Sequence, residues 1–283
     1  MTIHPEQTYS LVALDIDGTM IGDERLVKPE LVAAIDRVQK TGAVVSVSTG
    51  RTLRPALRIA EEAGAAGPVI CFQGAMTYDQ ITKMAIRHER LDEEVAKKAI
   101  SGLISVVPEV MMFLGDDIWV EQRSDWTDAY SERMGIEIRD IDSLTGMADQ
   151  QPTAIVGVGD PSIVEPLVEN LHERLNGTAL VTHSLPMFCE VEAIGAGKDL
   201  AVEHLADLLN VDRAGVIAVG DGKGDQSMIE WSGLGVAIEG GHYDAIESAD
   251  RVIGTPEEFG LINFLNELCD FGKFSSPDQK SHG

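Results

Sequence analysis

The stretch LVALDIDGTM, residues 11–20, ends an apolar run in two aspartates that stand two residues apart. Residues 11–14 have the pattern of a short buried strand, so Asp15 and Asp17 are expected where that strand ends. Two like charges placed there cost free energy unless a cation or a shared proton offsets them. The pair taken alone also fits a turn or a helix cap, because aspartate is common in both.

The apolar run is followed by alternating helix and strand patterns. Residues 29–42 have apolar side chains at helical spacing, and residues 43–48 form a β-branched run. The same order follows at residues 51–72, and the C-terminal third repeats it from residue 215 onward. This alternation predicts an α/β core with a doubly wound parallel sheet and helices on its faces.

The middle of the chain has a different pattern. Residues 84–187 contain longer strand-like runs, such as 111–122, separated by helical segments, and a further run at 179–193 crosses their C-terminal limit. We expect these residues to form a smaller inserted α+β domain, while residues 1–83 and 188–283 form the core.

Composition narrows the function classes. The chain has 283 residues, is 44% hydrophobic and has a formal net charge of −25. Such a charge repels nucleic-acid phosphates and anionic lipid, so neither nucleic acid nor a membrane is expected as a partner. The acidity also fits a solubility or high-salt adaptation. The chain has no long apolar segment, and its three cysteines lie far apart, so we expect a cytoplasmic protein without a disulfide framework or zinc site.

Three strand-like runs end in residues that can carry chemistry. The first ends in Asp15 and Asp17, the second in Thr49-Gly50-Arg51, and the run at 215–220 in Asp221, with Asp225 four residues later. In parallel sheets, ligands bind outside the carboxyl ends of the strands, so these groups are expected to converge. Converging carboxylates suit a hard cation such as Mg²⁺ that also binds a substrate phosphate.

Other nucleotide- and metal-binding motifs do not fit. An EF-hand loop beginning at Asp15 would have Leu26 in place of its twelfth-position glutamate. A phosphate-binding P-loop around Lys198 would need glycine at Glu192 and a hydroxyl residue at Asp199, and no GxGxxG follows a strand.

Lys198 stands in the first turn of a predicted helix at residues 198–209. A cation there opposes the helix dipole, at a cost of a few tenths of a kcal/mol or so. An anionic ligand or a carboxylate cluster beside the ammonium would explain its position, although a solvated surface lysine fits equally well.

Taken in order, the motifs DIDGT, VSVSTGR, GAGKDLAVEHL and GDGKGDQSMI resemble those of the haloacid dehalogenase superfamily of phosphohydrolases. The chain is most similar to its Cof-type sugar-phosphate phosphatases, in which a cap is inserted between the second and third motifs. The resemblance implies that Asp15 is the nucleophile, forming an aspartyl-phosphate. It implies that Asp17 is general acid and then general base, and that Lys198 neutralises the reacting groups.

The resemblance also implies the binding residues. Mg²⁺ would be held by Asp15, Asp221 and the backbone carbonyl of Asp17, with Asp225 ordering the outer shell. Thr49 would hold a phosphoryl oxygen through its hydroxyl and its backbone N–H. The phosphate-binding set as a whole would comprise Thr49, Gly50, Arg51, Gln73 and Lys198, and Gly18 and Thr19 would shape the loop after the first strand.

The chain departs from the family pattern at three asparagine positions, which are occupied by Gln73, Gly224 and Gly240. These changes concern the phosphate surround and the metal's outer shell. The function implied is a Mg²⁺-dependent phosphomonoester hydrolase acting on a small sugar phosphate or related metabolite. A phosphosugar mutase or phosphotransferase would use the same motifs, and a non-catalytic phosphometabolite-binding protein is the alternative of another class. The sequence does not indicate an oligomeric state.

Overall fold

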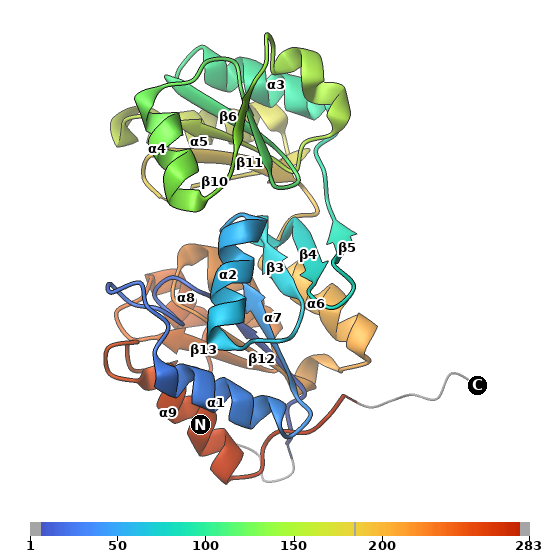
Figure 1. Ribbon diagram of the computed structural model, residues 1–283, viewed down its shortest axis with the longest axis vertical. Coiled ribbons are helices and arrows are strands. Elements are labelled where there is room, and N and C mark those ends of the chain that lie inside the picture. Colours follow the sequence, from blue (N-terminus) through green and yellow to red (C-terminus); the bar gives the residue numbers. More distant parts are fainter. Residues whose placement is uncertain (1–6, 184, 278–283) are drawn as a thin grey trace, which may run out of the picture. The chain divides into compact units, whose positions relative to one another are not determined.

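The structure is a computed structural model that describes residues 7–183 and 185–277. Two compact units divide the chain. The core unit comprises residues 1–51, 56–86 and 197–283, and the inserted unit comprises residues 52–55 and 87–196, each with its masked residues left aside. Both units have a sheet covered by helices (Figure 1).

The core unit is built on an eight-stranded sheet in the order β14-β13-β12-β1-β2-β3-β4-β5. The strands from β14 to β3 run parallel, and β4 is antiparallel to β3. The strand bounds are β1 (Leu11–Leu14), β2 (Val44–Ser48), β3 (Val69–Cys71), β4 (Met76–Asp79), β5 (Met84–His88), β12 (Val216–Gly220), β13 (Leu234–Ile238) and β14 (Arg251–Ile253).

Helices alternate with these parallel strands along the chain, as the sequence pattern predicts. They are α1 (Pro29–Gln39), α2 (Leu53–Ala63), α6 (Lys198–Leu209), α7 (Gln226–Trp231), α8 (Tyr243–Ser248) and α9 (Gly260–Asp270), with 3₁₀ turns η1 (Phe72–Gly74), η3 (Arg213–Gly215) and η4 (Lys223–Asp225). Helices α1 and α9 lie side by side (Figure 1). On one face of β1, Leu11 and Ala13 pack with α6 and α7 residues in a common apolar core.

Strand β1 lies in the middle of this sheet, between β12 and β2. All four of its residues are fully buried, which explains its uninterrupted apolar sequence. The carboxyl ends of β2, β1 and β12 are therefore neighbours, and the three polar segments that follow them begin at one edge of the sheet.

The inserted unit is built on a six-stranded, mostly antiparallel sheet in the order β10-β11-β9-β6-β7-β8. Helices α3 and α5 pack on a core that contains Met112, Ile155 and Val191. Its elements are α3 (Glu93–Ile104), β6 (Glu109–Leu114), β7 (Asp117–Val120), α4 (Asp125–Met134), β8 (Ile138–Asp140), η2 (Thr145–Gln150), β9 (Ala154–Val158), α5 (Pro161–Leu175), β10 (Ala179–Thr182) and β11 (Phe188–Ala193).

The expected limits of the insert, residues 84 and 187, were wrong in detail. Strand β5 (Met84–His88) belongs to the eight-stranded sheet, whereas β11 (Phe188–Ala193) pairs with β9 and β10 in the other sheet. The run at 179–193, expected as one long strand, is two antiparallel strands, and the run at 111–122 is likewise a hairpin of β6 and β7.

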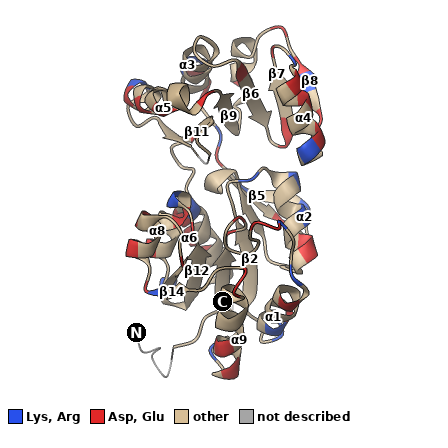
Figure 2. Cartoon of the chain, turned by 90° about the vertical axis from the view of Figure 1, so that its left-hand side faces the viewer, with Lys and Arg blue, Asp and Glu red and all other residues tan. Residues whose placement is uncertain are grey.

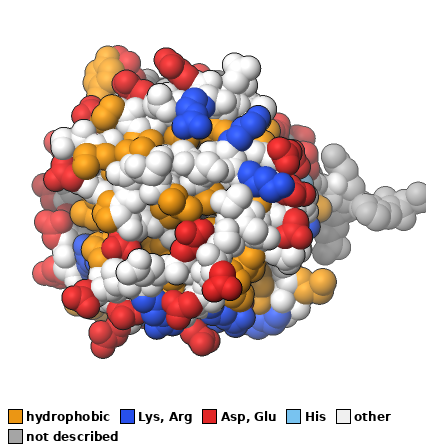
Figure 3. Space-filling model, turned by 90° about the horizontal axis from the view of Figure 1, so that it is seen from above, with side chains coloured by type: hydrophobic (Ala, Val, Ile, Leu, Met, Phe, Trp, Pro, Cys, Tyr) orange, Lys and Arg blue, Asp and Glu red, His pale blue; other side chains and the backbone are white. Residues whose placement is uncertain are grey.

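Acidic side chains are spread over the molecule. Figure 2 shows Asp and Glu residues on helices and loops of both units, and on the face seen in Figure 3 they are scattered between apolar and basic side chains. Among residues 7–183 and 185–277, no helix is long and apolar enough to cross a membrane.

Candidate active site

Three charged side chains meet beneath the ends of β1 and β12. The Lys198 ammonium donates to Asp15 Oδ1 at 2.7 Å and to Asp225 Oδ1 at 2.5 Å. Lys198, Asp15 and Asp225 are 4%, 6% and 2% exposed. The surface-lysine interpretation of Lys198 is therefore wrong: the first turn of α6 places this ammonium between two buried carboxylates.

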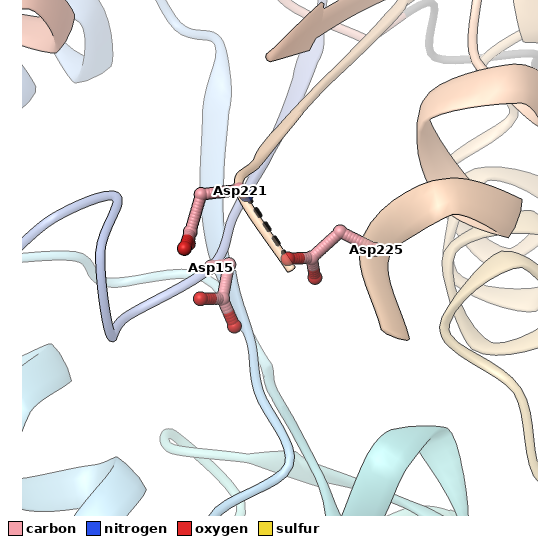
Figure 4. Close-up of side chains that lie close together, drawn as sticks. All are labelled: Asp15, Asp221 and Asp225. Atoms are coloured by element: carbon pink, nitrogen blue, oxygen red, sulfur yellow. Dashed lines mark hydrogen bonds between the residues drawn. The ribbon is translucent and has the colours of Figure 1, made fainter. Parts of the chain in front are cut away.

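Asp221 completes a group of three carboxylates, seen in Figure 4. One oxygen atom from each of Asp15, Asp221 and Asp225 lies within 4.8 Å of the others. Thr19 Oγ1 donates to Asp221 Oδ1 at 3.0 Å and so fixes this carboxylate from the loop after β1. Gly18 allows the approach, because its φ is +81° and a Cβ there would lie 2.2 Å from Asp221 Oδ2.

Both carboxylate oxygens of Asp225 accept hydrogen bonds from other groups of the protein. Its Oδ2 accepts hydrogen bonds from the backbone N–H groups of Asp221 and Gly222, at 3.1 and 2.8 Å, and its Oδ1 accepts from Lys198. The dashed line in Figure 4 is the first of these bonds. Asp225 thus orders the loop that carries Asp221 and the ammonium that faces Asp15.

Crowding of like charges perturbs the protonation of the site. Burial and the charge of Asp225 raise the pKa of Asp15 well above its usual range. The same two causes raise the pKa of Asp221 to about 6. Burial alone lowers the pKa of Lys198, but the charges of Asp15 and Asp225 outweigh it and the net shift is upward. The site therefore has more negative charge than one lysine neutralises.

The donor set fits a magnesium ion. Within the described residues, Asp15 Oδ2 and Asp221 Oδ2 accept no hydrogen bond, so both oxygens are available as ligands. Carboxylate oxygens are the ligands that Mg²⁺ prefers, and a divalent cation would offset the like-charge crowding.

The loop after β1 makes one tight turn. Met20 and Ile21 donate backbone hydrogen bonds to Ile16 O, and Gly18 N–H donates to Ile21 O. Asp17 projects from this turn with a side chain that is 58% exposed, whereas Asp15 is buried. The two aspartates of the motif thus have different surroundings, which suits different chemical roles.

Arg51 lies differently from its expected place in a phosphate-binding set. Its Nε and Nη2 atoms donate to the two oxygens of Asp17, at 2.7 and 2.6 Å. This paired geometry fixes the plane of the carboxylate. In the structure the guanidinium is therefore paired with the Asp17 carboxylate.

The expected phosphate contacts of Thr49 also need a partial correction. Its backbone N–H donates to Ile70 O at 2.9 Å in the ladder between β2 and β3, so only its hydroxyl is left to hold a phosphoryl oxygen. That hydroxyl is buried and accepts from Arg51 N–H at 3.2 Å, which leaves its own proton to be donated. Within the described residues the next N–H, that of Gly50, donates to no partner. Gln73 follows β3, with its N–H on Thr49 O at 3.3 Å.

A cavity of about 390 Å³ opens beside Asp17 and Asp221. It is lined by the loop after β1 and by the loops after β13 and β14, among them Gly240, Glu239 and Glu257. This volume lies in the range of small-molecule sites. Gly240 has a φ of +77°, so the glycine found in place of the family's asparagine suits a left-handed turn.

Two contacts in the candidate site were not predicted from the sequence. Thr19 was expected only to shape its loop, but it holds Asp221 by a hydrogen bond. Arg51 was expected on phosphate, but it holds Asp17. A threonine directly after Asp-x-Asp-Gly was the available signal for the first, and nothing local indicated the second.

Known proteins give an independent comparison. Residues 12–265 match the family of haloacid dehalogenase-like hydrolases. The chain is 24% identical to the putative phosphatase YxeH of Bacillus subtilis (strain 168), over 92% of this chain and 98% of that protein. It is 26% identical to the 5-amino-6-(5-phospho-D-ribitylamino)uracil phosphatase YitU of the same organism, over 91% of this chain and 96% of that protein.

The fold has relatives among solved structures. A haloacid dehalogenase-like hydrolase from Bacteroides thetaiotaomicron has a TM-score of 0.82 and 24% identity, covering 92% of this chain and 99% of that chain. The expected fold class, an α/β core with a smaller inserted domain, is confirmed by this likeness.

Proposed function

Because this chain belongs to the haloacid dehalogenase-like hydrolases and is a phosphatase, we propose that it hydrolyses a small phosphate monoester, with Mg²⁺, through an aspartyl-phosphate. The observation that carries the proposal is the buried Lys198 ammonium between Asp15 and Asp225, with Asp221 beside them. A structural ion pair needs one carboxylate, whereas this cluster has an excess of negative charge and two free oxygens.

Asp15 is the nucleophile in this proposal. One oxygen of its carboxylate attacks phosphorus, the bond between phosphorus and the ester oxygen breaks, and an aspartyl-phosphate forms. Lys198 holds Oδ1 and so orients the carboxylate while it offsets charge on the transferring group. Thr49 donates its hydroxyl hydrogen, and Gly50 its N–H, to phosphoryl oxygens.

Asp17 is the general acid and then the general base in this proposal. Its carboxyl group protonates the leaving alcohol, and its carboxylate then takes a proton from the water that attacks the aspartyl-phosphate, so that inorganic phosphate is released and Asp15 is restored. The turn after β1 and the Arg51 fork direct this side chain.

Replacing Arg51 tests that role of the fork. In Arg51→Ala the Asp17 carboxylate loses its fixed plane, and we expect kcat to fall roughly 10- to 100-fold with little change in KM. Arg51→Lys retains the charge but not the paired geometry, so it should resemble alanine more than arginine. Steady-state kinetics on a generic aryl phosphate measures both values. A rise in KM at unchanged kcat would instead place Arg51 on the substrate phosphate.

Asp15 and Asp221, with the backbone carbonyl of Asp17, would hold Mg²⁺. The ion would supply charge neutralisation for the phosphoryl group and a fixed position for it. Asp225 would keep Asp221 in place through the backbone bonds to its loop.

The substrate class proposed is a small sugar phosphate or related metabolite. The cavity beside Asp17 can receive a hydroxylated group, and its acidic lining disfavours further anionic groups on the substrate. One relative is named for a phosphorylated ribityl compound, which has such a hydroxylated chain. The inserted unit is proposed to select among these esters.

Release of inorganic phosphate from a panel of sugar phosphates, nucleotides and cofactor phosphates tests the function. We expect release from at least one ester, and removal of Mg²⁺ by EDTA should lower the rate at least about a hundredfold, reversibly. Phosphate found on an acceptor alcohol would instead establish phosphoryl transfer. No turnover of any ester, with or without Mg²⁺, would favour a binding protein.

A further inference from the structure

Gln73 occupies a constrained backbone position beside the site. Phe72 and Gln73 both have left-handed backbone angles, with φ of 51° and 50°. Such angles are unfavourable for residues other than glycine, and they persist only where surrounding contacts impose them. The contacts here are Phe72 N–H on Arg51 O at 2.9 Å and Gln73 N–H on Thr49 O at 3.3 Å.

Two glycines from other loops make room for the Gln73 side chain. A Cβ on Gly50, after β2, would lie 2.4 Å from Gln73 Nε2. A Cβ on Gly224, in the loop after β12, would lie 3.1 Å from Gln73 Oε1. The carboxamide is thus seated between the loop of Thr49 and the loop of Asp221 and Asp225, with each end against a residue that has no side chain.

The Gln73 carboxamide has a defined position but, among the described residues, no hydrogen-bond partner. Within residues 7–183 and 185–277, neither Nε2 nor Oε1 of Gln73 has a hydrogen bond to another residue. The Gln73 residue as a whole is half-buried. An oriented donor without a partner, next to the free N–H of Gly50, is suited to an oxyanion.

We propose that Gln73 Nε2 donates a hydrogen bond to the bound phosphoryl group, and that Gly50 and Gly224 are required to seat it, an inference that rests on the proposed function. Gln73 and Gly224 are then a matched pair: the long side chain at one position uses the space left by the missing side chain at the other. This explains in one step two of the three departures from the family pattern.

Binding of inorganic phosphate in the presence of Mg²⁺, measured by isothermal titration calorimetry, tests the donor. Gln73→Met keeps the length of the side chain without its N–H groups, and we expect phosphate to bind roughly 10- to 100-fold more weakly. Gln73→Glu keeps the shape but adds a negative charge, and the loss should be larger. Phosphate affinity within twofold of wild type in the Met variant would overturn the proposal.

A double-mutant cycle tests the matched pair. Gly224→Ala should weaken phosphate binding in wild type, because the new methyl group displaces the carboxamide, but should have little further effect in a Gln73→Ala background. Equal losses in both backgrounds would overturn the pairing. Gly146→Ala in the inserted unit, where a Cβ meets only ordinary contacts, is the control.

Different results would overturn the proposed function and the inference about Gln73. Phosphate binding that depends on Gln73 in a protein that hydrolyses no ester would overturn the proposed function but not this inference. Ester hydrolysis abolished by Asp15→Asn, together with phosphate binding that ignores Gln73, would overturn this inference alone.

Discussion

Asp15→Asn should lower turnover of any phosphate ester by at least about a thousandfold. The amide oxygen can still accept from Lys198 as Asp15 Oδ1 does, so the local structure is retained while the attacking carboxylate oxygen is lost. The variant also removes a buried carboxylate whose pKa is raised by burial and by the charge of Asp225. We therefore expect the metal-free variant to be at least as stable as wild type.

Phosphate release and thermal unfolding, measured on the same samples, separate loss of chemistry from loss of fold. Acid quenching with labelled substrate should trap a phosphorylated peptide containing Asp15 in wild type and none in the variant. Asp207→Asn, at an exposed position on α6, is a matched control that should keep full activity. Turnover of the Asp15→Asn variant within tenfold of wild type would show that another group attacks phosphorus.

The centre of the fold and the carboxylate cluster could be predicted because both depend on short, local patterns. Strand β1 has four consecutive fully buried residues, and a parallel sheet brings the ends of β1, β2 and β12 to one edge. Asp15 and Asp221 follow two of these ends directly. Their approach therefore follows from topology without knowledge of side-chain packing.

The limits of the insert could not be predicted in the same way. Strand β11 has alternate residues, Cys189 and Val191, in the core of the inserted unit, and its two glutamates, Glu190 and Glu192, are buried as well. Such a fully buried strand fits a parallel core sheet as well as the central part of an antiparallel one. Pairing with β9 and β10, which the chain pattern does not specify, decides its sheet.

The missed site contacts depend on the relative placement of loops. Arg51 and Asp17 follow different strands, and their fork forms because two neighbouring loops face each other at hydrogen-bond distance. The N–H of Thr49 is not available to a ligand because it donates to Ile70 O of β3. This bond extends the pairing of the two strands one residue past the end of β2. Neither fact has a signature in residue type or spacing.

Lys198→Met should affect both stability and activity. The lysine has a raised pKa, so its contribution to stability is fully present below about 10.4, the ordinary value for lysine, and is lost only as the pH rises through the raised value. At pH 7 the substitution removes all of it and leaves Asp15 and Asp225 buried without their counter-charge. We expect the free energy of unfolding to fall by about 3–5 kcal/mol.

Lower pH should reverse part of that loss. A carboxyl group whose pKa is raised in the folded state takes up protons on folding, so the folded variant gains stability relative to the unfolded chain as the pH falls from 7 toward 5. Denaturant unfolding at several pH values, without metal, should therefore show the gap between wild type and Lys198→Met narrowing in acid. Lys223→Met, at an exposed lysine in the loop after β12, is the control and should show no such gap.

Magnesium should rescue the fold of this variant but not its turnover. A divalent cation on Asp15 and Asp221 offsets the same excess charge that the ammonium offsets, so added Mg²⁺ should restore part of the lost stability. It does not replace the hydrogen bond from Lys198 Nζ that orients Asp15 Oδ1, so kcat should stay at least about a hundredfold below wild type. Full recovery of kcat with Mg²⁺ would assign Lys198 a purely structural role, whereas stability that is unchanged by metal would argue against the carboxylates as its ligands.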